Sequence, residues 1–289
     1  MPLESRRRPL VGTALAVIAA IGFALSNTLA SLAYEGGSNP LTVAALRFFL
    51  PAIVLFAWLR VERISLSLSG RDAWIAILLG VLTAQYTWAL LVAIHLIPLA
   101  LAVLLLYLFP FLTMIILVLF GWDKVSLRAT AAIAVAFAGL VLALEPRSGG
   151  ANFSGLALGF SAALGLALVI ALSSRVFGAG DARPLTLWMA AVAAALLATL
   201  CAARSEFQLP HADLGWIGLV GGMVLYGFAM ISFYVSVAMI GPVRASLLSY
   251  VEPVASALLG IAVLGQILAP VQFAGIALVI AALVAATVR

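Results

Sequence analysis

The sequence has few charged side chains, two histidines and a single cysteine. Only 9% of its 289 residues are Asp, Glu, Lys or Arg, whereas a typical soluble domain carries about 25%. A chain with so little charge cannot cover its surface with polar side chains, and 66% of its residues are hydrophobic. The single cysteine, Cys201, excludes an intrachain disulfide. These scarcities indicate a protein whose surroundings are mostly lipid.

The sequence also lacks the motifs of common membrane enzymes. It contains no His-Glu-x-x-His motif, no glycine-rich phosphate loop and no serine-nucleophile motif. Neither His95 nor His211 has a second histidine or a carboxylate at ligand spacing. We therefore expect no enzyme activity, no metal, no cofactor and no ATP-driven step within this chain. The net charge of +5 fits loops that fix membrane orientation, so no nucleic-acid partner is expected.

Long apolar runs separated by turn residues predict an all-α integral membrane protein, because a helix crosses the hydrocarbon with about 20 apolar residues. The ten predicted spans are 10–33, 40–59, 72–94, 97–120, 126–144, 154–173, 184–203, 214–238, 242–264 and 270–288. With the N-terminus inside, twelve of the 15 Lys and Arg residues lie on the cytoplasmic side and two lie outside. This bias predicts that both termini are cytoplasmic.

The two halves of the chain align weakly when one is shifted by 143 or 144 residues. Tyr107 and Pro110, in the fourth predicted span, meet Tyr250 and Pro253, in the ninth. The matched tyrosines and prolines fall at the same depth in matched spans. This agreement favours an internal repeat over a chance alignment of Ala-, Leu- and Gly-rich helices.

Each half holds five predicted spans, and five is an odd number, so the second half enters the membrane from the opposite side. The sequence therefore predicts an inverted repeat, with residues 1–147 in the first half and 148–289 in the second. Many secondary transporters share this architecture and bind substrate near the midplane between the repeats. We expect a central cavity there.

Polar and aromatic residues near the middle of several spans are candidates for lining the substrate cavity. They are Asn27, Gln85, Tyr86, Trp88, Tyr107, Tyr226, Ser249 and Tyr250. Two interpretations stay open for each: it contacts substrate, or it joins helices through interhelical hydrogen bonds.

Two charged residues and two prolines are candidates for coupling and movement. Glu252 is the only carboxylate in the run 240–264, and a charge at bilayer depth costs about 2.5–3.5 kcal/mol, so we expect a coupling or gating role. Arg47 lies inside a span and either binds a substrate carboxylate or is a structural cation. Pro110 and Pro253 interrupt matched helices, either as hinges or as static kinks.

Three short motifs make the whole chain resemble the EamA-type exporters of the drug/metabolite transporter superfamily. The motifs are Leu46-Arg47-Phe48, Tyr250-Val251-Glu252-Pro253 and Gln272-Phe273-Ala274-Gly275-Ile276-Ala277-Leu278. The resemblance implies helices around a central cavity, with spans five and ten peripheral, and export of amino acids or related metabolites by alternating access. Chain length and aromatic-containing spans are similar to the branch that exports aromatic amino acids.

The expected function is export of aromatic or other apolar amino acids and similar small metabolites by a multi-pass protein of the bacterial inner membrane. One chain holds both halves of the cavity, so a monomer embedded in the lipid bilayer suffices. The alternative is export of lipophilic cations or drugs, with Glu252 as counter-ion and proton carrier. Exchange of phosphorylated solutes ranks lower, because a phosphate needs several buried cations and only Arg47 is deep.

Overall fold

The computed structural model describes residues 3–68, 70–124, 126–145, 152–177, 181–264 and 268–287. These residues form twelve α-helices: α1 (Leu3–Glu35), α2 (Pro40–Val61), α3 (Gly70–Leu96), α4 (Leu99–Leu106), α5 (Phe109–Leu119), α6 (Leu127–Leu144), α7 (Phe153–Phe177), α8 (Ala182–Ala203), α9 (Asp213–Ile240), α10 (Pro242–Leu248), α11 (Val251–Leu264) and α12 (Pro270–Thr287).

The all-helical membrane fold predicted from the sequence is confirmed. Within the described residues, nine segments are long and apolar enough to cross a membrane, and Pro270–Ala286 adds a shorter apolar helix. These ten segments correspond to the ten predicted spans. The predicted boundary between the repeats, at residues 147 and 148, lies outside the described residues.

The fourth and ninth spans are each broken into two helices. The fourth consists of α4 and α5, separated at Tyr107 and Leu108, and the ninth consists of α10 and α11, separated at Ser249 and Tyr250. Proline has no N–H to donate, and its ring clashes with the carbonyl four residues earlier. Pro110 and Pro253 therefore account for the breaks that precede them.

Helices of the first half pack against helices of the second in matched pairs. α1 packs along α9, and its counterpart in the second half, α7, packs along α3. In the same way α2 packs on α8 and α9, and its counterpart α8 packs on α2 and α3. α2 and α8 run antiparallel, because Asn39, before α2, donates to the Glu206 carbonyl, just after α8, at 2.6 Å. Exchanging the halves preserves this pattern of neighbours.

Small residues permit the close approach of α1 and α9. A Cβ added at Gly218 would lie 2.6 Å from the Leu29 carbonyl oxygen and 2.7 Å from the Ala33 nitrogen. One turn later, the Ser26 hydroxyl donates to the Gly222 carbonyl at 2.8 Å. Interfaces between membrane helices favour such residues because backbones can then approach closely.

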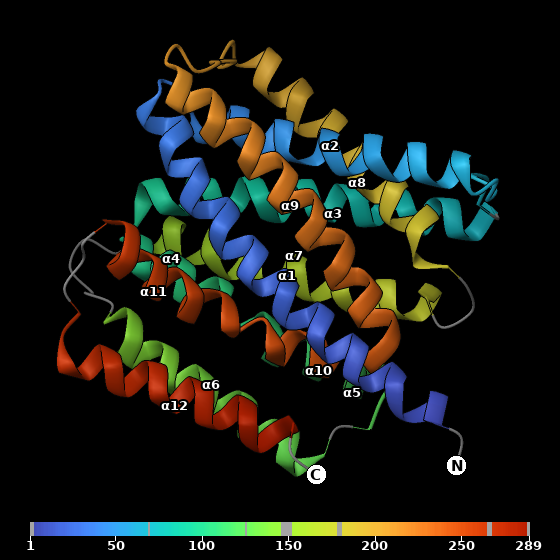
Figure 1. Cartoon of the computed structure of the whole chain (residues 1–289), viewed down its shortest axis with the longest axis vertical. Helices are drawn as coiled ribbons and strands as arrows, with labels where there is room; N and C mark the ends of the chain where they lie inside the picture. The colour runs from blue at the N-terminus through green and yellow to red at the C-terminus, as the bar shows by residue number, and fades with distance from the viewer. Residues whose placement is uncertain are drawn as a thin grey trace.

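α6 and α12 form a pair side by side at the edge of the bundle (Figure 1). A Cβ added at Gly139 would lie 2.8 Å from the Gly275 carbonyl oxygen, so the backbones touch there. The Gln272 side-chain amide donates to the Ala143 carbonyl at 3.1 Å. These are spans five and ten, and none of their described residues lines the pocket described next.

Candidate functional site

Residues from both halves of the chain line a pocket with a volume of about 190 Å³. Its first-half walls come from α1, α2, α3 and the α4–α5 break, and its second-half walls from α7, α9 and the α10–α11 break. Most of its lining is aromatic or aliphatic. The charged residues of the lining are Arg47 and Glu252, as far as the structure describes the chain.

Glu252 occupies the first turn of α11, a turn that exists because the ninth span is broken. Backbone N–H groups at a helix N-terminus favour a negative charge, so the break gives this acid a place where it is tolerated. The Asn27 side-chain amide donates to Glu252 Oε1 at 3.1 Å. The side chain of Tyr107 also interacts with the Glu252 carboxyl. The acid is thus held by residues of α1 and of the break in the fourth span.

Arg47 reaches the same pocket from α2. Its Cζ lies 4.8 Å from the centre of the Tyr226 ring, in a cation–π contact. Its Nε is buried and has no hydrogen-bond partner among the described residues. The Thr83 hydroxyl, also in the lining, is buried and unpartnered in the described part of the chain. Buried donors without partners are costly, so these two groups can donate hydrogen bonds to a ligand at little further cost.

The breaks of the two spans touch each other through Tyr107 and Tyr250. The Tyr250 hydroxyl donates to the Tyr107 carbonyl at 2.9 Å, and the two ring centres lie 5.6 Å apart. Tyr250 is 0% exposed. A helix break frees carbonyls that need a donor in an apolar interior, and Tyr250 supplies one. We call this contact the tyrosine crossing.

Most of the candidate residues share one pocket. Its lining includes Asn27, Arg47, Tyr86, Tyr107, Tyr226, Ser249 and Glu252. The structure places three other candidates elsewhere. Gln85 donates to the Ser161 hydroxyl at 2.8 Å and so joins α3 to α7. Trp88 lines a second pocket, and Tyr250 forms the tyrosine crossing rather than the pocket wall.

Several lining residues were not among the sequence candidates. Thr83 and Thr87 flank Tyr86 on α3, and Met230 and Phe233 follow Tyr226 on α9. Residues three, four and seven positions apart share a helix face. Extending each central tyrosine along its helix by that spacing would have found Thr83, Met230 and Phe233, and Thr87 lies four positions after Thr83.

The comparisons with known proteins decide the family. Residues 10–144 and 153–288 each match the sequence model of the EamA-like transporter family. The chain belongs to the EamA-like transporter family. A crystal structure of another protein is similar in fold, with a TM-score of 0.79 and 22% identity over 95% of this chain and 96% of that one. No curated protein matches the chain in sequence.

This EamA-like transporter is a membrane transporter of the drug/metabolite transporter superfamily. Its pocket is continued by a second one of about 480 Å³, which includes Trp88, His95 and Arg204. Pro40 and Leu91 line both pockets. The path from the first pocket therefore leads to the end of the bundle where α2 begins, which we call the Asn39 end.

The transporter is closed at the opposite end. α5 packs against α10 there, while no comparable packing joins α4 to α11 in the described chain. The two broken spans therefore touch on one side of the tyrosine crossing and part on the other. We call the closed side the Arg183 end, after the polar cluster that lies on it.

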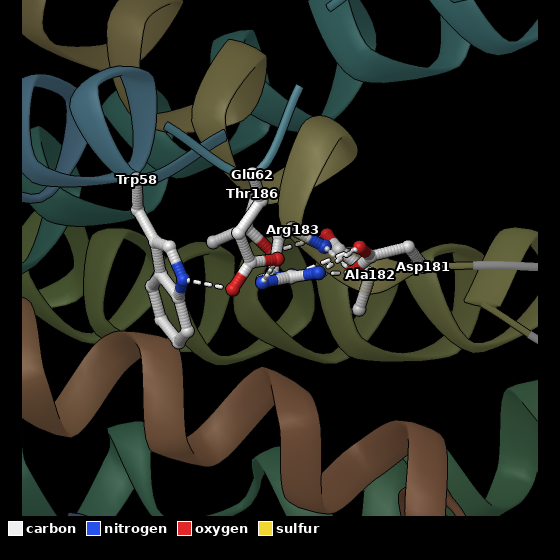
Figure 2. Close-up of polar contacts among 6 residues, drawn as sticks. All are labelled: Trp58, Glu62, Asp181, Ala182, Arg183 and Thr186. Atoms are coloured by element: carbon white, nitrogen blue, oxygen red, sulfur yellow. Dashed lines mark hydrogen bonds and ion pairs between the residues drawn. The ribbon is translucent and has the colours of Figure 1, made fainter. Parts of the chain in front are cut away.

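Figure 2 shows that cluster, which ties the end of α2 to the start of α8. Arg183 pairs with Glu62 at 2.7 Å and with Asp181 at 2.6 Å. The Trp58 indole donates to the Glu62 carboxylate at 2.5 Å. Hydrogen bonds from Trp58 and Arg183 lower the pKa of Glu62. Hydrogen bonds from Arg183 lower the pKa of Asp181. Both acids therefore stay ionised at neutral pH.

Proposed function

We propose that this transporter exports aromatic or other apolar amino acids, and similar small metabolites, across the bacterial inner membrane by alternating access. The observation that carries the proposal is that one guanidinium and one carboxyl line the same pocket, whose remaining walls are mostly apolar. In the proposed orientation both termini and the Arg183 end are cytoplasmic, because Lys and Arg concentrate in the loops of that side.

A zwitterion with an apolar side chain fits this chemistry. Its carboxylate would bind the Arg47 guanidinium, whose planar fork suits two parallel hydrogen bonds. Its ammonium group would lie toward Glu252 and Asn27, which already form one hydrogen-bonded unit. Its side chain would lie among rings such as Phe48 and Phe233, which line the same pocket.

Coupling is assigned to the acid side of the pocket. Glu252 is an ionisable residue at bilayer depth, where such residues mark proton or substrate pathways. We propose that Glu252 exchanges a proton for the substrate's ammonium group. Arg47 then orients the carboxylate and leaves the acid free to titrate.

The alternative substrates fit less well. A phosphorylated solute would need several cations, and Arg47 is the one Arg or Lys of the lining in the described chain. A lipophilic cation would find Glu252 and several aromatic rings, but Arg47 in the same pocket would repel it. Export of lipophilic cations remains the second outcome that the transport assay distinguishes.

Transport by reconstituted proteoliposomes tests the substrate class. Labelled phenylalanine, labelled serine and labelled tetraphenylphosphonium are offered separately, and protein-free liposomes give the background. We expect phenylalanine flux well above background and above serine flux. Cation flux without phenylalanine flux would replace this proposal with the lipophilic-cation alternative.

The proposed orientation has its own test. A reporter that is active only in the cytoplasm is fused after Arg289, and the same reporter is inserted near Gln208, at the Asn39 end. We expect activity from the first fusion and none from the second. The reverse pattern would overturn the orientation and leave the fold unchanged.

A further inference from the structure

Thr113 and Ser256 occupy equivalent positions in the repeat, each one helical turn beyond a pocket-lining residue of a broken span. Phe109 and Glu252 are repeat mates, 143 residues apart, and both line the pocket. Four residues further on are Thr113 in α5 and Ser256 in α11. Residues four apart lie on the same helix face. Thr113 therefore lies one turn toward the Arg183 end, and Ser256 one turn toward the Asn39 end.

The two hydroxyl residues have unlike environments. Thr113 is 0% exposed, and its hydroxyl is buried without a hydrogen-bond partner among the described residues. Ser256 is partly exposed. The difference follows the packing, because α5 is pressed against α10 while α11 has no comparable contact with α4 in the described chain.

A buried hydroxyl without a partner is unfavourable where it stands. Valine would fill nearly the same space as Thr113 and would leave no polar atom unpaired. The hydroxyl is accounted for if a second conformation of the protein gives it water. The repeat indicates which conformation that is, because α4 corresponds to α10 and α5 to α11. Exchanging the conformations of the halves packs α4 against α11 and separates α5 from α10.

We propose that Thr113 and Ser256 line the two ends of one translocation route and exchange environments during each transport cycle. In the structure described here, Ser256 is partly exposed, on the side where α11 has no comparable contact with α4 in the described chain, and Thr113 is sealed. In the second state, Thr113 faces water at the Arg183 end and Ser256 is packed. The inference rests on the proposed alternating access, and it names where the closed end opens: along the contact between α5 and α10.

Cysteine labelling tests this exchange. Thr113→Cys and Ser256→Cys are made separately in the full-length chain and treated with a membrane-impermeant thiol reagent, from one side of oriented vesicles and then from the other. The native Cys201 is 0% exposed and serves as the unreactive reference in the parent protein. We expect Ser256→Cys to react only from the Asn39 side, and Thr113→Cys only from the Arg183 side.

Saturating phenylalanine supplied on one side should change the two labelling rates in opposite directions, each by about threefold or more. Labelling of both cysteines from the same side would overturn the inference. So would a Thr113→Cys protein that transports normally but never reacts from either side. If Thr113→Cys does not fold, Leu117→Cys takes its place, because Leu117 lies one further turn along the same face and is 1% exposed.

Phenylalanine flux by the parent protein keeps this inference separate from the proposed function. A parent protein without flux contradicts the proposed function, whatever the labelling shows. A parent protein with flux but with both cysteines reactive from one side contradicts only the route between α5 and α10.

Discussion

Replacing Tyr250 with phenylalanine removes the hydrogen bond of the tyrosine crossing and leaves both rings in place. The hydroxyl donates to the Tyr107 carbonyl at 2.9 Å, and the side chain is 0% exposed. The variant therefore leaves a buried carbonyl without that donor. Because the side chain is sealed from solvent, hydration does not replace the lost bond.

The expected loss of stability follows from the burial of this hydrogen bond. Leaving a buried polar group unsatisfied costs about 1–3 kcal/mol, while interhelical hydrogen bonds measured within a membrane protein reach only about 1.7 kcal/mol. We therefore expect Tyr250→Phe to lose about 1–2 kcal/mol of stability. At roughly 2–4 °C per kcal/mol for a chain of this size, the midpoint of thermal unfolding in detergent should fall by about 2–8 °C.

Thermal unfolding and phenylalanine flux are measured on the same preparations. Tyr34→Phe is the matched control, because Tyr34 is 37% exposed and its hydroxyl is not sealed in the protein interior. A Tyr250→Phe protein with the unfolding midpoint of the control would show that the tyrosine crossing does not hold the breaks together. If the midpoint falls but the flux per folded molecule is unchanged, the crossing is structural and the breaks are static kinks rather than hinges.

Three further predictions concern other parts of the molecule. Arg47→Gln should reduce phenylalanine flux at least tenfold with little change in unfolding midpoint, and equal losses for Arg47→Gln and the exposed Arg204→Gln would contradict a substrate contact. Glu62 and Asp181 have pKa values below their ordinary 4.5 and 3.8. Their contribution to stability is therefore complete above about pH 4.5 and is lost as the pH falls through the lowered pKa values. Glu62→Gln should accordingly make the unfolding midpoint less sensitive to pH between 5 and 3. Gly275→Val should separate α6 from α12 and lower the midpoint, whereas Ala274→Val, its neighbour in the same helix, should be milder.

The sequence was sufficient for the fold because its signals there are strong. Nearly continuous apolar runs define the spans, and the matched Tyr107–Pro110 and Tyr250–Pro253 segments revealed the repeat. The two prolines also marked the broken helices, since a missing N–H and a ring clash act wherever the helix lies. The exact break could not be placed, because each break falls two to four residues before its proline.

The site was only partly accessible from the sequence. Counting residues gave the depth of a side chain but not the direction in which it points. Tyr107 and Tyr250 are equivalent in the repeat, yet one lines the pocket and the other donates to its mate's carbonyl. Gln85 and Tyr86 are adjacent and face different neighbours. Such differences of direction depend on how the helices are rotated against one another, which the repeat alone does not specify.

The role of Glu252 is tested most directly by pH-driven flux through Glu252→Gln proteoliposomes. Phenylalanine efflux is measured with and without an imposed pH gradient, and exchange of labelled for unlabelled phenylalanine at equal pH serves as the check on folding. We expect the variant to retain exchange but to lose its response to the gradient. A Glu252→Gln protein whose flux responds to the gradient as the parent does would contradict the assignment of this acid as the coupling group.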